Sequence, residues 1–431
     1  MTQGASRVAV IGAGWAGLAA AVAASRAGHA VTVFETTRQP GGRARRLDLV
    51  LPDGEAVALD NGQHILIGAY VQTLALMREV GVDPARVLRR LPLTLRFPDG
   101  DGVALPDWPV PLDAAWGIAR ARGWSLADKA SLLRHAVGWQ MQGFTCDESL
   151  TVAALCRKLR PAVLRDLIDP LCVSALNTPS GRASGRVFLR VLRDALFAPA
   201  QGGWGASNLL LPAADLGALF PQAAVGWLQA RGAQVRFGAR VQTLHPEGDG
   251  WQVDGQAFDA VLLAAPPWEA ERLVAGAGVE ARDWLAAAGG LAHEAIATVY
   301  TMGGPRLPLP LLALRPGPQA PAQFAFDRGH LGGPPGLLAW VVSASTGDAA
   351  TLEGQVVAQA RALGWRVDPI RTVVEKRATF ACTPGLRRPG VRVAPGLFAC
   401  GDYVEGPYPA TLEGAVRSAL QAVDLLGRPV S

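Results

Sequence analysis

The stretch from residue 8 to residue 35 reads VAVIGAGWAGLAAAVAASRAGHAVTVFE and decides the fold of this chain. An apolar run of strand character (8–11) leads directly into three glycines spaced G-x-G-x-x-G, and an alanine-rich segment of helical composition follows. A second apolar run (30–34) ends in Glu35. Strand, glycine turn, helix and a strand with an acidic end form the βαβ unit that binds dinucleotides, so we expect a nucleotide site here.

Each residue type in this unit has a separate role. Gly12 permits the tight turn, Gly14 lets the backbone approach the pyrophosphate, and Gly17 lets the helix pack on the strand. The N-terminus of the helix offers N–H groups and a positive dipole end to phosphates. Glu35 can accept hydrogen bonds from ribose hydroxyls, which favours an unphosphorylated adenosine ribose.

The composition limits the class of protein. The chain has 431 residues, of which 50% are hydrophobic and 18% charged, and it carries a net charge of +5. This is enough material for a large core and two domains. No apolar run approaches the ~18 residues of a transmembrane helix. No basic run interleaved with aromatic residues covers a long surface, so we expect no nucleic-acid partner.

Cysteine and histidine spacing predicts a reducing compartment without a metal site. The five cysteines are odd in number and form no C-x-x-C pair, and the six histidines show neither H-x-x-x-H nor H-E-x-x-H spacing. We therefore expect buried free thiols, a cytoplasmic location and no bound metal.

The segment 108–144 has helical character and an unusual composition. Four tryptophans alternate there with arginines and a lysine, and apolar residues recur at helical spacing at Leu126, Ala130, Leu133 and Val137. Two interpretations are open. The segment is an ordinary helical domain whose apolar face packs in a core, or it is an interfacial helix that contacts a membrane surface.

Further motifs lie beyond the first unit. A Gly-Gly-Arg turn at 41–43 allows unusual backbone conformations beside a phosphate-binding side chain. A polar loop, DNGQH, occupies 60–64, and Gly-Asp at 401–402 follows a buried strand and precedes a closing helix over 411–426. Turn residues predict a hairpin within 93–105. Strands at 295–302, 323–327, 337–343 and 372–380 suggest an antiparallel sheet.

Together these motifs resemble the FAD-dependent amine oxidase and phytoene desaturase superfamily over essentially the whole chain. The residues that carry the resemblance are Gly12, Gly14, Gly17, Glu35, Gly41-Gly42-Arg43, Gly401-Asp402 and Glu413-Gly414-Ala415. The resemblance implies an α/β fold, in which a glutathione-reductase-type, Rossmann-like FAD domain carries a second α+β domain for the substrate. The expected FAD domain is discontinuous (1–92, 205–290 and 385–431). The expected substrate domain combines 93–204, mainly helical, with an antiparallel sheet in 291–384.

The same resemblance assigns roles to single residues. In the superfamily the terminal Asp binds the ribityl chain of FAD, and the closing helix points its N-terminus at the flavin pyrimidine ring, where it stabilises negative charge. The backbone of Val241 is expected against adenine. The residues expected to contact FAD are Gly12, Ala13, Gly14, Trp15, Ala16, Gly17, Glu35, Gly42, Arg43, Gly62, Gln63, Val241, Gly401, Asp402, Thr411 and Leu412.

A second set of residues narrows the resemblance to the hydroxysqualene dehydroxylases, also described as squalene-associated FAD-dependent desaturases. These residues are Asp60-Asn61-Gly62-Gln63-His64, Ala175-Leu176-Asn177-Thr178-Pro179, Val187-Phe188-Leu189, Leu209-Leu210-Leu211-Pro212, Asp215-Leu216, Phe326-Asp327 and Pro409-Ala410-Thr411-Leu412-Glu413-Gly414-Ala415. Membership implies that reduced FAD removes the hydroxyl of hydroxysqualene and gives squalene in hopanoid biosynthesis. A lipophilic C30 isoprenoid substrate favours peripheral contact with the inner face of the cytoplasmic membrane. The sequence shows no convincing NAD(P)H site, so we expect an external electron donor.

Other activities stay open at this point. A carotenoid or phytoene desaturase or isomerase shares the substrate class, and a non-catalytic flavoprotein could carry isoprenoids. An amine substrate is not expected, because amine oxidases usually place an aromatic residue just before the run that contains Glu413, whereas this chain has Thr411 two residues before it.

Removal of a hydroxyl group requires a proton donor, and the polar loop supplies the candidates. His64 is the expected acid because imidazole titrates near neutral pH. The alternative is that His64 only hydrogen-bonds the flavin or the backbone. Asp60, the second predicted catalytic residue, is expected to orient the loop or to cap a backbone amide.

Overall fold

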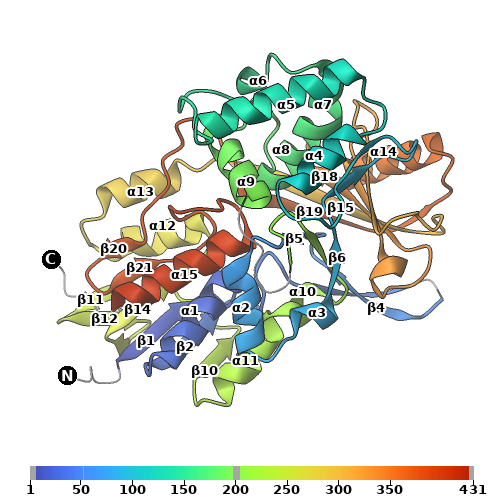
Figure 1. The fold of residues 1–431 in the computed structure, drawn as a ribbon. Helices are drawn as coiled ribbons and strands as arrows, with labels where there is room; N and C mark the ends of the chain where they lie inside the picture. Colours follow the sequence, from blue (N-terminus) through green and yellow to red (C-terminus); the bar gives the residue numbers. More distant parts are fainter. Residues whose placement is uncertain (1–5, 52, 198–203, 427–431) are drawn as a thin grey trace.

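The computed structural model describes residues 6–51, 53–197 and 204–426 (Figure 1). A six-stranded sheet with the order β10-β2-β1-β14-β21-β20 forms its first layer, and every neighbouring pair is parallel except β21 and β20. Its strands are β1 (Arg7–Ile11), β2 (Ala30–Glu35), β10 (Gln234–Phe237), β14 (Ala260–Leu263), β20 (Arg392–Ala394) and β21 (Leu397–Ala399). The predicted strand–helix–strand unit is confirmed, and it occupies the centre of this sheet.

Small side chains let helices lie close to this sheet. Helix α1 (Trp15–Arg26) follows β1 directly, and the six alanines among its residues are buried. Helix α15 (Leu412–Leu426), from the other end of the chain, packs along α1 (Figure 1). Because Val8, Ala9 and Val10 have no exposed surface, β1 is central to the core.

A second, antiparallel sheet has the order β16-β17-β18-β15-β19. Its strands are β15 (His293–Met302), β16 (Leu311–Ala313), β17 (Phe324–Asp327), β18 (Leu338–Ser343) and β19 (Asp368–Phe380). Helix α14 (Ala349–Ala362) packs against β15 and β19. The sequence predicted β15, β17, β18 and β19 but not β16, and the structure confirms these four strands and their antiparallel pairing.

Helices that lie in sequence between β2 and β10 of the first sheet form a helical cap, defined here as residues 112–197, at the top of Figure 1. Its elements are α4 (Leu112–Ala119), α5 (Leu126–Met141), α6 (Val152–Leu155), α7 (Pro161–Val163), the π-helix η1 (Leu164–Ile168), α8 (Asp169–Leu176) and α9 (Gly185–Phe197). The predicted hairpin precedes the cap as β7 (Thr94–Arg96) and β8 (Gly102–Ala104).

Shorter elements connect these parts. They are β3 (Arg46–Val50), β4 (Ala56–Asp60), β5 (Leu66–Ile67), α2 (Val71–Glu79), α3 (Pro84–Val87), β6 (Leu88–Leu91), β9 (Leu209–Pro212), α10 (Leu216–Leu219), α11 (Pro221–Gln229), β11 (Leu244–Glu247), β12 (Gly250–Val253), β13 (Gln256–Phe258), α12 (Pro267–Gly276), α13 (Arg282–Gly289) and the 3-10 helix η2 (Arg328–Leu331). Across the described ranges, no helix is long and apolar enough to cross a membrane. His, Cys, Asp and Glu side chains form no group able to hold a metal ion in those same ranges.

The structure contradicts one of the two interpretations of the tryptophan-rich segment 108–144. Helix α5 turns Leu126, Leu133 and Val137 outward, and Leu126 is 85% exposed. The buried side of the helix carries Asp128, Ser131, Leu132 and Trp139 instead. The core-packed interpretation is therefore wrong for this apolar face, although the helix itself is anchored in the core by its opposite side.

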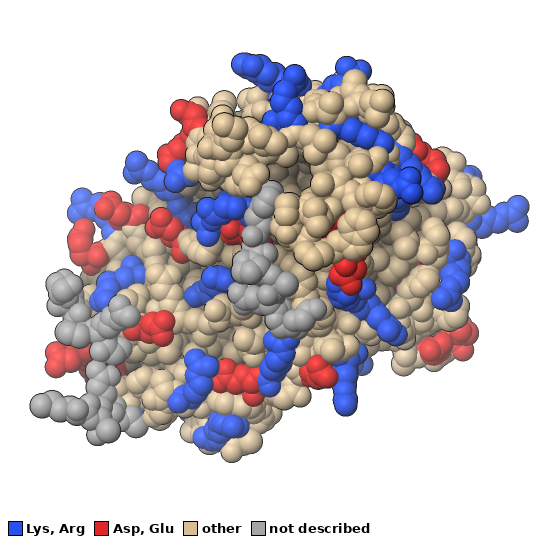
Figure 2. Space-filling view, viewed as in Figure 1, with Lys and Arg blue, Asp and Glu red and all other residues tan. Residues whose placement is uncertain are grey.

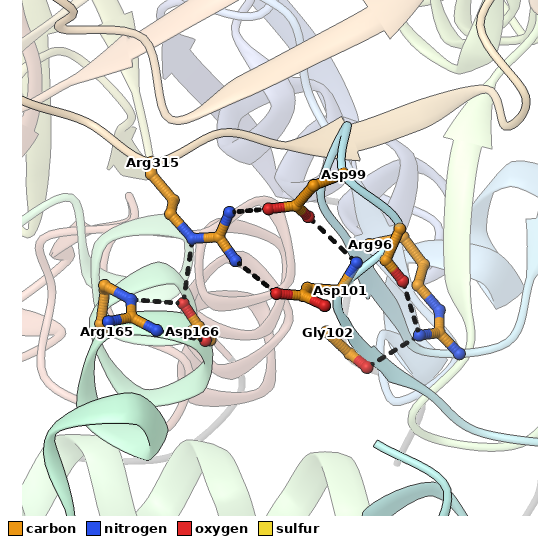
Figure 3. A network of polar contacts seen from close by, with 8 residues as sticks. Arg96, Asp99, Asp101, Gly102, Arg165, Asp166 and Arg315 are labelled. Carbon is orange, nitrogen blue, oxygen red and sulfur yellow. Dashed lines mark hydrogen bonds and ion pairs between the residues drawn. The ribbon is translucent and has the colours of Figure 1, made fainter. Parts of the chain in front are cut away.

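An ion-pair network joins the helical cap to the β7–β8 hairpin and to the second sheet (Figure 3). Arg315, which follows β16, pairs with Asp99 and Asp101 (3.3 Å) in the turn between β7 and β8. It also reaches Asp166 of η1 (3.3 Å), whose carboxylate pairs with Arg165 at 2.8 Å. Asp166 has no exposed surface, so its charge depends on these two arginines for compensation.

Candidate active site

The first glycine loop lies at the carboxyl end of β1, where the backbone has no room for side chains. Gly12 has a φ of +109°, and a Cβ added to it would lie 2.7 Å from the carbonyl oxygen of Ala264. A Cβ on Gly17 would lie 1.9 Å from the carbonyl oxygen of Gly12. The two glycines thus fix the turn and the close approach of α1, as the spacing predicts.

The Gly-Gly-Arg turn lies directly against this loop. Gly41 donates its N–H to the carbonyl oxygen of Ala13 (2.8 Å) and forms a parallel bridge with Gly14. A Cβ on Gly42 would come within 3.2 Å of the Gly14 Cα. The two glycine motifs, residues 12–17 and 41–42, are separate in the sequence but lie side by side. Their backbone atoms form one continuous surface without side chains, the glycine surface.

Glu35 lies at the end of β2 and faces the same loop. It is buried, and its carboxylate accepts hydrogen bonds from the Ala13 N–H (2.7 Å) and from the N–H and hydroxyl of Thr37 (2.7 and 2.8 Å). Val241 is also buried, and its carbonyl oxygen accepts a hydrogen bond from Arg272 (2.9 Å).

The terminal Gly-Asp motif meets the Gly-Gly-Arg turn. Asp402 follows β21 and forms an ion pair with Arg43, a residue 359 positions earlier. Arg43 also donates to the carbonyl oxygen of Ala378 on β19 (2.6 Å), and the Gly401 N–H donates to the hydroxyl of Ser418 on α15 (2.9 Å). Arg43 therefore joins the end of β21 in the first sheet to β19 in the second sheet, and Gly401 joins the same motif to the closing helix.

The N-terminus of α15 is held in place from two sides. Thr411 caps the helix, since its hydroxyl accepts the Gly414 N–H at 3.0 Å. The Glu413 carboxylate, fully buried, accepts hydrogen bonds from the Thr73 N–H (2.9 Å) and hydroxyl (2.7 Å) at the start of α2. Leu412 is the first residue of the helix.

The polar loop 60–64 lies between the two sheets. The Asn61 side chain donates to the Arg43 carbonyl oxygen (3.4 Å) and to the Glu375 carboxylate on β19 (3.3 Å). The Gln63 N–H donates to the Thr298 hydroxyl on β15 (3.4 Å). The structure thus brings this loop beside Arg43 and Asp402, at the junction of the glycine surface and the antiparallel sheet.

The comparison with protein families fits this arrangement. The family of flavin-containing amine oxidoreductases matches residues 15–300 of the chain. The chain belongs to that family. Among curated relatives, the hydroxysqualene dehydroxylase of Rhodopseudomonas palustris is 30% identical over 97% of this chain and 98% of its own. The hydroxysqualene dehydroxylase of Sinorhizobium fredii is 28% identical over 97% of each chain.

Solved structures agree on the fold of this flavin oxidoreductase. A putative protoporphyrinogen oxidase from Exiguobacterium matches with a TM-score of 0.68 over 97% of this chain and 98% of that one, at 16% identity. Cyclohexylamine oxidase from Brevibacterium oxydans matches with a TM-score of 0.66 over 98% of both chains, at 14% identity. These similarities establish the α/β architecture with its second, antiparallel sheet.

FAD is the cofactor of this family, and the residues present fit it. Gly14 is the N-cap residue of α1 and has no side chain to cap it, and the first turn of the helix has no acidic residue, so the first N–H groups are left for phosphate oxygens. Gly42 leaves the space above Gly14 free of side-chain atoms, and Glu35 offers a buried carboxylate beside the loop. The Trp15 side chain turns away into the core, where it packs on Phe220 at a centroid distance of 5.1 Å.

The two predicted catalytic residues have different surroundings. The Oδ1 atom of Asp60 accepts the Leu216 N–H (2.7 Å) at the start of α10, so its carboxyl caps a backbone amide. Burial raises the pKa of Asp60 to about 7, against the opposing charge of Arg328. Nδ1 of His64 lies 2.7 Å from the Gly62 carbonyl oxygen. A carbonyl only accepts, so Nδ1 carries the proton of the neutral ring and Nε2 is the atom free to titrate.

Burial, followed by the positive charge of Arg43, lowers the pKa of His64.

A second histidine near Arg43 was missed by the sequence reasoning. His293 begins β15, and its ring lies 5.4 Å from the Trp268 ring. Burial and the charges of Arg43 and Arg377 lower its pKa. No local motif marks His293, because its place in the site depends on contacts with distant segments.

Proposed function

We propose that this flavin oxidoreductase removes the hydroxyl group of hydroxysqualene and gives squalene. The observation that carries the proposal is the similarity to hydroxysqualene dehydroxylases over nearly the whole of both chains. Zeta-carotene desaturases, by contrast, match only 17% of this chain. The substrate is a C30 isoprenoid that partitions into lipid, and an external electron donor is required to reduce the flavin.

The reaction replaces a hydroxyl group by hydride, and the hydroxyl leaves with a proton as water. Reduced FAD supplies the hydride when it is bound. The protein must bind the isoprenoid, exclude bulk water and deliver the proton to the departing oxygen. The loop 60–64 offers polar atoms for this last task at the junction of the two sheets.

We assign the proton transfer to Nε2 of His64 and a positioning role to Asp60. Because burial and Arg43 lower the pKa of His64, its protonated form is populated only toward acidic pH. We therefore expect turnover to rise as the pH falls below neutrality in the wild-type protein. In the variant His64→Gln this acidic increase should disappear, with turnover reduced by roughly 10²-fold or more.

Rates measured with prereduced enzyme over a pH series would check this expectation, with flavin content as the control for folding. A His64→Gln variant that keeps both the wild-type rate and the wild-type pH profile would assign the proton transfer to another group.

The activity itself is tested under anaerobic conditions. The protein is photoreduced and mixed with hydroxysqualene, and flavin reoxidation is followed together with squalene formation. The expected result is reoxidation of the flavin with squalene formed in equal amount. Oxidised protein that instead introduces double bonds into phytoene would identify a desaturase. Tight isoprenoid binding without flavin reoxidation would identify a carrier.

A further inference from the structure

We propose that the helical cap carries a binding site for the headgroups of anionic phospholipids, flanked by apolar side chains that enter the bilayer. This site is separate from the flavin site, and the inference goes beyond the proposed reaction.

The first observation is where exposed apolar side chains lie. Among the described residues, nine large hydrophobic side chains are exposed, and eight of them fall between residues 108 and 141. The eight are Trp108, Val110, Leu112, Trp116, Leu126, Leu133, Val137 and Met141. Exposed apolar side chains scattered singly need no explanation, but a concentration within 34 residues around two helices marks an interaction surface.

Helix α5 shows that this concentration is ordered. Leu126, Leu133, Val137 and Met141 recur at helical spacing along one side, and Leu126 and Met141 are 85% and 84% exposed. The opposite side packs in the core through Leu132 and Trp139. A surface helix normally turns its apolar stripe inward, so this outward stripe needs an apolar environment to cover it.

Two tryptophans, Trp108 just before the cap and Trp116 within α4, have the chemistry of a membrane interface. The rings of Trp108 and Trp116 lie 5.2 Å apart, and the guanidinium of Arg120 lies 5.2 Å from the Trp116 ring centre. Tryptophan is enriched at the boundary between headgroups and acyl chains, because it combines a large apolar ring with one polar N–H.

A basic cavity adjoins these tryptophans. It has a volume of about 620 Å³ and lies between the β7–β8 hairpin, α4 and the beginning of α5. The lining residues are Arg96, Ala104, Leu105, Pro106, Trp116, Ala119, Arg120, Arg122 and Lys129. Four of the nine are basic and none is acidic.

The positive charge of this cavity has no salt-bridge partner among the described residues. Within the described ranges, Arg96, Arg120, Arg122 and Lys129 take part in none of the ion pairs. The Lys129 ammonium donates to the Ala119 carbonyl oxygen (2.8 Å), and Arg96 donates to the Gly102 carbonyl oxygen (2.9 Å). Burial, and then the neighbouring charge of Arg122, lower the pKa of Arg96, and the negative charge of Asp101 opposes them without reversing the direction.

Charge complementarity identifies the occupant. Four unpaired cations beside exposed tryptophans suit a phosphate group at the surface of a bilayer, and the apolar stripe of α5 suits the acyl chains below it. Figure 2 shows basic side chains gathered along the upper edge of the molecule, with uncharged surface between them. A protein partner would have to match both features, whereas an anionic bilayer presents both at once.

The experiment is cosedimentation of the purified flavoprotein with vesicles of phosphatidylcholine alone or mixed with phosphatidylglycerol. We expect the wild-type protein to bind the anionic vesicles. The double variant Arg120→Glu/Arg122→Glu should lose more than about tenfold in affinity, since each basic residue near an anionic surface contributes about 1 kcal/mol. The variant Leu126→Ser/Met141→Ser should weaken binding to a similar extent.

Matched controls distinguish an effect of this site from a general effect of net charge or of exposed apolar surface. Arg361→Glu/Arg366→Glu changes the net charge equally at exposed positions outside the cap, and Val50→Ser removes an exposed apolar residue elsewhere. Both controls should bind within about twofold of the wild type. Flavin content checks the folding of every variant.

Two results would overturn the proposal: wild-type protein that stays unbound with anionic vesicles, or an Arg120→Glu/Arg122→Glu variant that binds them normally. Self-association abolished by Leu126→Ser/Met141→Ser, without vesicle binding, would assign the surface to a protein contact instead. None of these outcomes depends on turnover, so they are distinguishable from failure of the proposed reaction.

Discussion

At the scale of single residues, Asp60 shows how the site combines burial with charge. One carboxyl oxygen accepts the Leu216 N–H, while among the described residues Oδ2 has no hydrogen-bond partner. Arg328 provides an opposing charge, and its own Nε is also without a partner in those residues. A buried carboxyl with a pKa of about 7 holds a proton that it would release in water, so Asp60 couples the folding of this loop to pH.

The variant Asp60→Asn tests this coupling. Between about pH 4 and pH 7 the folded state retains the Asp60 proton and the unfolded state has lost it, so stability falls as the pH rises through this window. The whole effect amounts to about 4 kcal/mol at most. We expect Asp60→Asn to remove this component, so that its melting temperature falls less than that of the wild type between pH 5 and pH 8.

Thermal unfolding across that pH range measures the difference, and Asp53→Asn, at an exposed position, serves as the control. Parallel curves for Asp60→Asn and the wild type would show that Asp60 is ionised with an ordinary pKa.

At the scale of elements, the position of α15 depends on one buried carboxylate. Glu413 accepts hydrogen bonds from Gln72 (3.1 Å) and Thr73 at the start of α2, and Arg417 donates to it at 2.7 Å. Gly414 follows directly, and a Cβ there would lie 2.1 Å from the Tyr408 carbonyl oxygen. Glu413 and Gly414 therefore fix the direction of α15 and how closely its N-terminus approaches the neighbouring backbone. The family resemblance places this N-terminus at the flavin.

We expect Glu413→Ala to leave buried N–H and hydroxyl donors without acceptors, at a cost of about 3 kcal/mol in the free energy of unfolding. Flavin content should fall as well, because the N-terminus of α15 loses its anchor to α2. Thr73→Val is the matched variant, since it removes only the hydroxyl donor to the same carboxylate and should cost about 1 kcal/mol. Urea unfolding and the flavin-to-protein absorbance ratio measure both effects. Equal stability of the two variants would contradict an anchoring role for Glu413.

At the scale of the whole molecule, sequence reasoning succeeded where the signal is local. The βαβ unit and the antiparallel strands follow from apolar runs and turn residues, so their positions could be predicted. The pairing of Arg43 with Asp402 joins opposite ends of the chain, and only the family resemblance placed these motifs together. No strand was predicted at 311–313, where the structure has β16 of the second sheet. Short apolar runs do not specify which neighbour they will pair with.

The apolar stripe of α5 shows a second limit. Helical spacing identifies which residues share a face, but it carries no information about whether that face meets the core or the solvent. Contacts on the opposite side of α5 determine the orientation of the helix, because Trp139 packs in the core and Asp128 pairs with Arg160 at 2.7 Å. Orientation is thus a property of the assembled cap.

How the cap is held on the rest of the molecule gives the last prediction. Arg315 contacts Asp99, Asp101 and the buried Asp166, and its guanidinium lies 4.3 Å from the Phe97 ring centre. Arg315→Met keeps most of the packing on Phe97 and removes every ion pair of Arg315, so we expect a loss of about 2 kcal/mol in the free energy of unfolding and faster proteolysis within the cap, residues 112–197. The flavin should be retained, because the glycine surface draws on other elements. Arg165→Met removes only the second partner of Asp166 and should have a smaller effect. Proteolysis at equal rates in Arg315→Met and the wild type would show that packing alone holds the cap.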